Sequence, residues 1–248
     1  LLDLKAKPVI GHRGAAAYAP ENTLESFRCA IRLGADALEF DIRASAEGTP
    51  MVFHDATLDR TTNLSGPIGS YSAAALAEAD AGFRFSDAGG GYPYRGAGVN
   101  IPTLRAVLAS FPDVPLLLEV KEREVQQAVA LILLDCGAAH RAVVAGSDWR
   151  ALRVFTSERF HRGASQRDIA RLFFRLGSPH PACRCYAVPD HYHGLRIPSQ
   201  RFVQAAQRRK STVHVWTVDD GAVAQGLWAN GVNGIVSNRP DVIRAARS

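Results

Sequence analysis

The sequence predicts an α/β protein that folds as a (β/α)8 barrel, or TIM barrel, with a small insertion after the second strand. Short apolar runs alternate along the chain with amphipathic helical patterns. Strands that are apolar on both faces and are separated by helices are typical of a parallel sheet that is covered on both sides. The chain has 248 residues, and one barrel of this type takes about 250. Eight strand–helix units in this length favour a closed barrel over an open sheet.

The predicted strands are spread along the whole chain. They are Val9–His12, Leu38–Ile42, Leu116–Val120, Ala142–Ala145, His161–Ala164, Cys185–Val188, Val213–Val218 and Gly234–Ser237. Helical patterns lie between them over Thr23–Leu33, Leu104–Phe111, Glu124–Cys136, Trp149–Ser157, Gln166–Leu176, Ser199–Arg209, Ala222–Asn230 and Asp241–Ala246. Each predicted strand is thus followed by one predicted helix, as a barrel of this type requires.

Two segments do not fit a plain strand–helix unit. Arg43 to His54 is predicted as an extended arm, a turn at Glu47-Gly48 and a return strand over Pro50–His54. The stretch from Thr57 to Asn100 is rich in Gly, Ser and Ala and is too long for an ordinary loop. We therefore expect a single domain over residues 1–248, with an insertion over about 57–100 on one face of the barrel.

Composition and charge exclude several classes of protein. Hydrophobic residues make up 47% and charged residues 21%, which is ordinary for a soluble globular protein. No apolar run approaches the roughly 20 residues that span a bilayer. The net charge of +5 permits anionic partners without requiring them. The densest basic run, Arg208-Arg209-Lys210, is interpreted as the solvated end of a helix, and no nucleic-acid motif accompanies it.

The cysteines and the first residues bear on location. The four cysteines do not have the spacing of zinc ligands and are interpreted as buried free thiols, which favours a reducing compartment. Residues 1–7 lack the apolar core of a signal peptide. We therefore expect a cytoplasmic protein. Because the first residue is not Met, a removed upstream segment and a periplasmic or secreted location stay open.

Acidic side chains occur at alternate positions in the second predicted strand. Glu39 and Asp41 share one face of the strand, because residues i and i+2 point to the same side. Two adjacent carboxylates repel each other unless something neutralises them. An exposed strand face would solve this, but the flanking sequence is that of a central strand. A cation between the two carboxylates is the better account.

The third predicted strand ends in the same way. Glu119 and Lys121 share one face at the end of a very apolar strand, where burying a charge is costly unless it is paired or binds metal. A simple ion pair between these two is one interpretation. Combined with Glu39 and Asp41, Glu119 would instead complete a three-carboxylate site. Oxygen ligands suit hard cations such as Mg²⁺ or Ca²⁺.

Other polar residues follow predicted strands. His12 and Arg13 come directly after the first strand, where the catalytic groups of barrels emerge, and the planar guanidinium of Arg13 suits a phosphate. His54 ends the return strand, and Asp55 is placed either to orient its imidazole or to cap the next turn. Each of these signals is weak alone. Trp216 is suited either to the core or to the wall of a substrate pocket.

In its motifs the chain resembles the glycerophosphodiester phosphodiesterases, the GDPD family. The matching pieces are His12-Arg13-Gly14, Pro20-Glu21-Asn22-Thr23, Glu39-x-Asp41, Val52-Phe53-His54-Asp55, Glu119-Val120-Lys121, Val215-Trp216-Thr217-Val218, the run from Gly231 to Val236, and Arg239-Pro240. They occur in the expected order over nearly the whole chain. Departures from the family pattern are Ser45-Ala46-Glu47-Gly48, Gly146-Ser147-Asp148 and Ser237-Asn238. These bear on substrate preference rather than on the reaction.

The resemblance implies a barrel enzyme that binds one divalent cation, Mg²⁺ or Ca²⁺. It implies that Glu39, Asp41 and Glu119 hold the metal, that His12 and His54 form a general acid–base pair, and that Arg13 and Lys121 bind the phosphate; we assign Trp216 to substrate binding as well. The substrate would be a small glycerophosphodiester, hydrolysed to glycerol 3-phosphate and an alcohol. The attacking nucleophile, water or the glycerol 2-hydroxyl, stays open, as does the oligomeric state. No nucleic-acid partner is expected.

Three alternative functions remain. The first is a hydrolase of lysophospholipids that resembles phospholipase D, for which the aromatic side chains of the insertion would form an apolar groove; they are Phe83, Phe85, Tyr92 and Tyr94. The second is a phosphate-binding barrel without catalytic activity, which the presence of every expected ligand disfavours. The third is a metal-independent barrel that cleaves phosphatidylinositol, and the three carboxylates argue against it.

Overall fold

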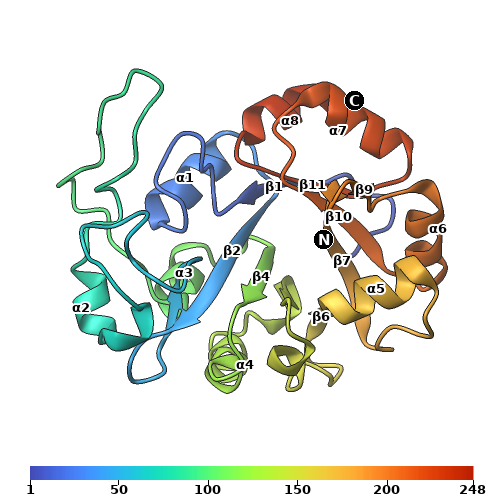
Figure 1. Cartoon of the computed structure of the whole chain (residues 1–248), viewed down its shortest axis with the longest axis horizontal. Helices are drawn as coiled ribbons and strands as arrows, with labels where there is room; N and C mark the ends of the chain where they lie inside the picture. The colour runs from blue at the N-terminus through green and yellow to red at the C-terminus, as the bar shows by residue number, and fades with distance from the viewer. Residues whose placement is uncertain (248) are drawn as a thin grey trace.

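The structure, a computed structural model that describes residues 1–247, is a closed barrel of eight parallel strands surrounded by helices (Figure 1). The barrel strands are β1 (Val9–His12), β2 (Ala37–Ala44), β4 (Leu116–Val120), β5 (Ala142–Ala145), β6 (His161–Gly163), β7 (Cys183–Pro189), β10 (Thr212–Trp216) and β11 (Gly234–Ser237). Neighbours along the chain pair in parallel, and β11 pairs with β1 to close the ring. The predicted fold class is confirmed.

Helices form the outer layer. They are α1 (Leu24–Arg32), α3 (Leu104–Ser110), α4 (Gln126–Asp135), α5 (Gln166–Phe174), α6 (Gln200–Arg208), α7 (Gly221–Ala229) and α8 (Pro240–Ala246). Their bounds differ from the predicted ones by a few residues, because capping side chains lie just outside the helices; Thr23 and Ser199, for example, cap α1 and α6. In the described part of the chain, none of the helices has the length and apolarity to cross a bilayer.

The period of two along the strands divides the core into two layers. On β2, Leu38, Phe40 and Ile42 are fully buried in the layer between the sheet and the helices. Ile10 and Leu117 belong to a smaller cluster inside the barrel. The alternate positions of β2 therefore face the barrel interior, and near the carboxyl end of the strand these positions are acidic.

One predicted helix is wrong. The segment from Trp149 to Ser157 forms only one turn of 3-10 helix, η3 (Trp149–Leu152), followed by turns. The side chain of Asp148 caps this turn by accepting the N–H of Arg150. Beyond it, Phe155 turns inward and packs edge-on against Phe160, with 5.3 Å between the ring centroids. Burying these two rings fixes the path of the chain here, which a regular helix would not allow.

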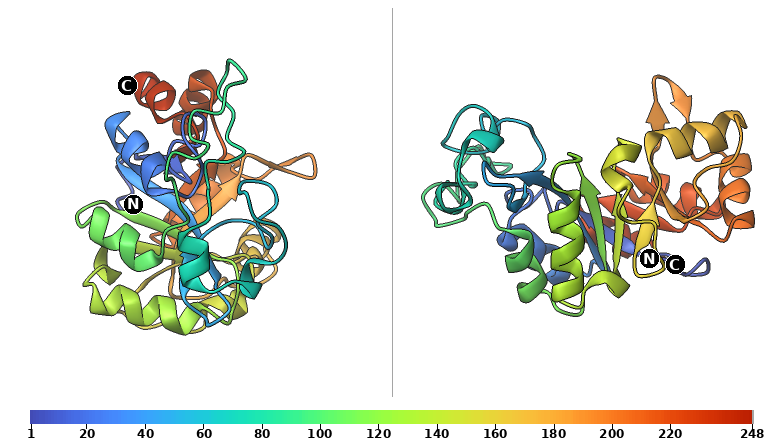
Figure 2. Two further views of the ribbon diagram at one scale, coloured as in Figure 1. Left: turned by 90° about the vertical axis from the view of Figure 1, so that its left-hand side faces the viewer. Right: turned by 90° about the horizontal axis from the view of Figure 1, so that it is seen from below.

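The segment after β2 departs from the strand–helix repeat as expected. A short strand, β3 (Pro50–Val52), returns antiparallel to β2 and ends two residues before the predicted bound at His54. The predicted insertion contains η1 (Ile68–Ser70) and α2 (Ala73–Ala77). It has its own apolar cluster, which includes Leu58, Ile68 and Leu76. Figure 2 shows this segment at the same end of the barrel as the hairpin β8–β9 (His191–Tyr192 and Leu195–Arg196), with both chain termini at the other end.

A histidine lies inside the barrel wall. His214 of β10 is fully buried, and its Nε2 lies 3.0 Å from the carbonyl oxygen of Leu1 and therefore carries the proton. Its Nδ1 has no hydrogen-bond partner. Burial lowers the pKa of His214 to about 3. Gly234 is its register partner on β11 and leaves room for the ring.

Replacing the buried Gly234 and the exposed Gly226 by Ala should have opposite effects. A Cβ at Gly234 would lie 3.0 Å from Cε1 and 3.1 Å from Cγ of His214, whereas a Cβ at Gly226 in α7 would meet no atom within 4 Å. We expect Gly234→Ala to lower the free energy of unfolding by about 1–3 kcal/mol. Gly226→Ala should raise it by about 0.5–1 kcal/mol, because Gly is a poor helix former. Urea unfolding measures both, and equal effects of one sign would contradict the packing described for Gly234.

The neutral state of His214 predicts that stability falls in mild acid. In the unfolded chain a histidine takes up a proton near pH 6.5, whereas His214 in the folded protein stays neutral down to about pH 3. The unfolding free energy that the neutral His214 contributes is therefore fully present above pH 6.5 and is lost progressively as the pH falls below this value. Between pH 7 and pH 5 the native protein should lose about 2 kcal/mol more unfolding free energy than His214→Gln. If the unfolding free energies of the native protein and of His214→Gln, measured with urea, changed equally with pH, the neutral state of His214 would be contradicted.

Candidate active site

Three carboxylates meet at the carboxyl ends of two neighbouring strands. Glu39 and Asp41 lie on β2 and Glu119 on β4, where Asp41 and Glu119 are register partners. One carboxylate oxygen from each residue lies within 4.8 Å of the other two. Glu39 is 8% exposed and Asp41 1%, so both charges are buried. The structure thus brings together the three acidic residues that the sequence placed in one cluster.

The first strand–helix loop holds two of these carboxylates by hydrogen bonds. The backbone N–H of Arg13 donates to Glu39 Oε2 at 2.9 Å. The side-chain amide of Asn22 donates to Asp41 Oδ2 at 3.0 Å, and its own oxygen accepts the backbone N–H of Asp41. Asn22 has a φ of 59°, a conformation that Asn tolerates better than most residues. Asn22 is therefore a hydrogen-bond partner of Asp41, whereas its neighbour Thr23 is the N-cap of α1.

Two cations compensate part of the negative charge. Lys121 Nζ lies 2.9 Å from Asp41 Oδ1 and 2.7 Å from Glu119 Oε2, and Arg13 Nε lies 3.2 Å from Asp41 Oδ2. Burial alone would raise the pKa of Asp41, but the charges of Lys121 and Arg13 outweigh it, and the pKa lies below its usual value. Burial, and next the charge of Asp41, raise the pKa of Glu39 well above its usual value. Glu39 is the carboxylate that lacks enough positive charge.

This donor set fits a divalent cation. Three carboxylates converge, and among the residues described only two cationic side chains, Arg13 and Lys121, contact them. Oxygen-only ligation is the chemistry that hard cations prefer. The interpretation of Glu119 and Lys121 as an isolated ion pair is incomplete, because Lys121 also contacts Asp41 and Glu119 also accepts a hydrogen bond from Ser147 Oγ at 3.0 Å.

His12, at the end of β1, is held by Asn238, which follows the neighbouring strand β11. Its Nδ1 lies 2.7 Å from Asn238 Oδ1. Asn238 in turn donates its amide group and its backbone N–H to the carboxylate of Asp219, each at 2.7 Å. Because Asp219 takes the Asn238 amide hydrogens, the amide oxygen faces His12 and Nδ1 is the protonated nitrogen. Burial, and next the charge of Arg13, lower the pKa of His12. The neutral ring then presents an unprotonated Nε2.

His54 is held by a different partner. Its Nδ1 lies 2.6 Å from Asp55 Oδ1, so Asp55 orients the imidazole. Arg60 binds the other oxygen of Asp55 at 2.5 Å and also contacts both carboxylate oxygens of Glu21, at 2.8 and 2.7 Å. Burial would raise the pKa of Asp55, but the hydrogen bonds from Arg60 and His54 lower it to about 2. Asp55 is therefore ionised in the folded protein at neutral pH.

Glu21 connects the two halves of the site. It accepts a hydrogen bond from Arg13 Nη1 at 2.8 Å as well as the two from Arg60. Ion pairs thus run without a break from Arg13 through Glu21, Arg60 and Asp55 to His54. Burial would raise the pKa of Glu21, but its two arginine partners lower it. Glu21 therefore joins the residues around His12 to those around His54.

Trp216 lies apart from the residues above. It ends β10, two strands around the ring from β1, and its side chain is 41% exposed. This excludes the core interpretation. Its backbone oxygen accepts the N–H of Asp190, just before the hairpin β8–β9. Trp216 therefore stands at the end of a barrel strand beside a projecting hairpin.

The aromatic residues of the predicted insertion pack on one another. Phe85 meets Tyr94 edge-on at 5.3 Å between centroids. The guanidinium of Arg95 lies 3.8 Å from the ring centre of Tyr92 and 4.6 Å from that of Phe83. The four rings thus contact one another or Arg95, and these contacts do not form the apolar groove that a lysophospholipid substrate would need.

Some residues of the site gave little signal in the sequence. Asn238 and Asp219 follow strands β11 and β10, and the rule that barrel sites form at the carboxyl ends of strands applies to both. Arg60 lies in an irregular segment and Ser147 follows β5. For Arg60 the sequence gave no signal of its contact with Glu21, because the two residues are 39 positions apart and meet only in the folded chain.

Comparison with known proteins identifies the family. The family model described as the glycerophosphoryl diester phosphodiesterase family matches residues 12–242. The glycerophosphodiester phosphodiesterase of Caldanaerobacter subterraneus subsp. tengcongensis is 28% identical over 249 residues, which covers 95% of this chain and 95% of that protein.

Solved structures agree with the fold. The glycerophosphoryl diester phosphodiesterase domain of a Mycobacterium tuberculosis protein superimposes with a TM-score of 0.84 at 20% identity, covering 98% of this chain and 100% of that chain. A phosphodiesterase from Oleispira antarctica, solved with the product sn-glycerol-3-phosphate, gives a TM-score of 0.74 at 26% identity over 97% of this chain and 96% of that chain. With a family model that spans nearly its whole length and the site geometry described above, this chain belongs to the glycerophosphoryl diester phosphodiesterase family.

Proposed function

We propose that this protein hydrolyses glycerophosphodiesters to glycerol 3-phosphate and an alcohol. The observation that carries the proposal is the arrangement at the carboxyl ends of β1 to β4, where two oriented histidines accompany a three-carboxylate cluster and two cations. Family membership supports the reaction class. The product bound in the Oleispira antarctica relative supports glycerol 3-phosphate as the product here.

Glu39, Asp41 and Glu119 are proposed to hold one divalent cation, Mg²⁺ or Ca²⁺. When bound, such an ion supplies positive charge that neutralises a phosphoryl oxygen and stabilises the charge that develops in the transition state. Asn22 and the backbone of Arg13 hold the carboxylates in position through the hydrogen bonds described above.

Arg13 and Lys121 are proposed to bind the phosphate. Both side chains lie beside the carboxylate cluster and are mostly buried, with 17% and 13% of their side-chain surface exposed. A guanidinium offers two parallel N–H donors to a phosphate, and an ammonium acts as a compact charge. Trp216 is proposed to contact the alcohol part of the substrate, since it is exposed at the end of its strand.

The different hydrogen-bond partners of the two histidines support different roles for them. The neutral amide of Asn238 holds His12 with Nε2 unprotonated, which suits a general base that takes the proton of the nucleophile. Asp55 Oδ1 lies 2.6 Å from His54 Nδ1 and fixes the orientation of the ring, which suits a general acid that protonates the leaving alkoxide. We therefore propose His12 as the base and His54 as the acid.

Exposed apolar side chains beside the strand ends favour a second candidate function, the hydrolysis of lysophospholipids. Tyr192 and Leu195 on the β8–β9 hairpin are 54% and 50% exposed, close along the chain to the segment that contacts Trp216. They would suit a substrate that retains an acyl chain, such as a lysophospholipid. Rates of hydrolysis of glycerophosphocholine and lysophosphatidylcholine distinguish the two substrate classes.

Removing either histidine should abolish most of the activity. His12→Ala and His54→Ala are each expected to lower kcat on glycerophosphocholine by at least about 100-fold, the lower range for loss of acid–base catalysis. His140→Ala serves as the matched control, because His140 precedes β5 at the opposite end of the barrel. Activity of both site variants close to that of the control would exclude the proposed roles.

Divalent cations should stabilise the protein through the carboxylate cluster. After treatment with a chelator, addition of Mg²⁺ or Ca²⁺ at about 100 times its Kd should raise the Tm by roughly 5–10 °C and restore turnover. Glu119→Gln should remove most of this rise. Glu124→Gln, at a largely exposed residue outside the cluster, should retain it. A Tm that is insensitive to both ions, together with activity that resists the chelator, would refute the metal site.

A further inference from the structure

The positive charge of the chain is concentrated in one segment. Residues 169–218 contain eight Lys or Arg and a single acidic residue, Asp190, which gives a net charge of +7. The rest of the chain contains 21 Lys or Arg and 23 Asp or Glu, a net charge of −2. The overall charge of +5 therefore understates how basic this part of the molecule is. The segment begins within α5 and ends two residues after β10, and of the proposed site residues it contains only Trp216.

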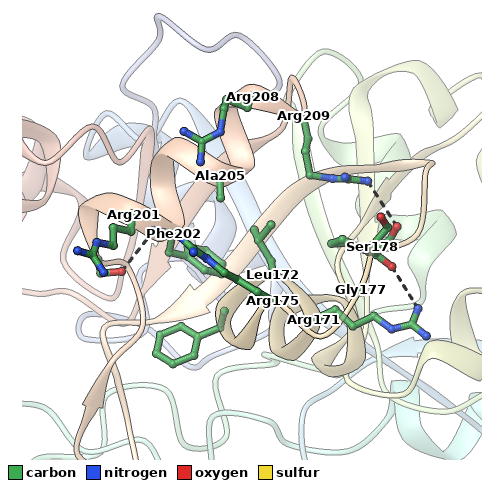
Figure 3. A pocket seen from close by; sticks show the side chains of 13 residues that line it. Arg171, Leu172, Arg175, Gly177, Ser178, Arg201, Phe202, Ala205, Arg208 and Arg209 are labelled. Atoms are coloured by element: carbon green, nitrogen blue, oxygen red, sulfur yellow. Dashed lines mark hydrogen bonds between the residues drawn. The ribbon is translucent and has the colours of Figure 1, made fainter.

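A groove of about 380 Å³ lies between α5 and α6 within this segment (Figure 3). Its lining includes five arginines, Arg171, Arg175, Arg201, Arg208 and Arg209, and contains no acidic residue. Leu172, Phe173 and Phe202 supply apolar walls. The run interpreted as a solvated helix end, Arg208-Arg209-Lys210, contributes two of the five arginines.

The groove arginines lack the ion pairs that several other described arginines make. Arg13, Arg43, Arg60 and Arg247 each pair with a carboxylate. Within residues 1–247, none of the five groove arginines has a carboxylate within 4.0 Å. Arg171 and Arg209 donate only long hydrogen bonds, of 3.4 and 3.5 Å, to the carbonyl oxygens of Ser178 and Pro179. The groove is therefore a concentration of positive charge that the protein itself does not neutralise.

Large apolar side chains are exposed beside these charges. Phe174 is 57% and Leu176 is 69% exposed at the end of α5, on either side of Arg175. Exposing both costs free energy in water, since each loses the gain of burial. Guanidinium groups next to exposed aromatic and aliphatic side chains are the composition of surfaces that lie in the headgroup layer of a membrane.

We propose that this face, the α5–α6 surface, docks the protein onto bilayers that contain anionic phospholipids. Lipid phosphates would accept the arginine N–H groups of the groove, while Phe174 and Leu176 enter the boundary between headgroups and acyl chains. A small soluble phosphate would account for the charge but would leave both apolar side chains in water. A nucleic acid would likewise need the charge but would make no use of an exposed Leu176. The lipid surface is the occupant that satisfies both observations.

The surface and the proposed active site belong to different parts of the fold. The groove is on the outer helical layer, whereas the carboxylates and histidines lie at the carboxyl ends of β1 to β4 on other strands of the ring. Docking therefore leaves hydrolysis of a water-soluble substrate unchanged. This separation allows binding and catalysis to be tested independently.

Co-sedimentation with vesicles tests the proposal. The native protein should bind vesicles of phosphatidylglycerol and phosphatidylcholine but not vesicles of phosphatidylcholine alone, and salt should weaken the binding. Arg175→Gln with Arg208→Gln should weaken partitioning by about 30-fold, from about fivefold per basic residue. Phe174→Ser with Leu176→Ser keeps the charge and should also weaken it. Arg28→Gln with Arg159→Gln, two exposed arginines outside the segment, is the control with the same net charge.

Three results would overturn the proposal. The first is equal vesicle binding by the two arginine double variants. The second is no vesicle binding by the native protein, accompanied by binding of inorganic phosphate that Arg175→Gln with Arg208→Gln removes, which would assign the groove to a soluble anion. The third is binding to RNA or DNA but not to vesicles. Hydrolysis of glycerophosphocholine, measured for every variant, should stay unchanged and shows that each variant is folded.

Discussion

The burial of two neighbouring carboxylates on one strand determines much of the structure around the site. Glu39 and Asp41 lie on the inner face of β2, where water does not solvate them. Each needs partners, because an unpaired buried charge costs several kcal/mol. The strand itself supplies none, since its other face is committed to the apolar layer beneath the helices. The partners are Lys121, which follows β4, and Arg13 and Asn22 from the loop between β1 and α1.

The same requirement explains the supporting contacts. Asn22 adopts a left-handed backbone conformation and gives both ends of its amide to Asp41. Arg13, also with a positive φ, offers its backbone to Glu39 and its side chain to Asp41 and Glu21. Unfavourable backbone conformations of this kind persist where surrounding contacts fix them. Even so, the charge of Glu39 is not fully compensated, which is the physical reason for expecting a cation.

The sequence was sufficient for the fold and for the acidic part of the site. Apolar runs located all eight barrel strands, and alternation along β2 and β4 placed Glu39, Asp41 and Glu119 on inner faces. Contacts between remote segments were not accessible in this way. The contact of His12 with Asn238 exists only once β11 meets β1 and the ring closes, and that of Glu21 with Arg60 joins loops 39 residues apart. The segment after Trp149 has a helical pattern but forms a short 3-10 turn, beyond which Phe155 packs on Phe160.

The attachment of Arg60 affects which substitutions are tolerated nearby. Arg60 lies at the root of the long segment between β3 and α3, and it binds Asp55 and Glu21 together. The tip of that segment, around Gly89–Gly91, has no such tie to the barrel and is exposed. Substitutions at the tip therefore leave the contacts of Asp55 and Glu21 in place. Substitution of Arg60 at the root would remove a partner from both carboxylates at once, so the two ends of the segment differ in the changes that they tolerate.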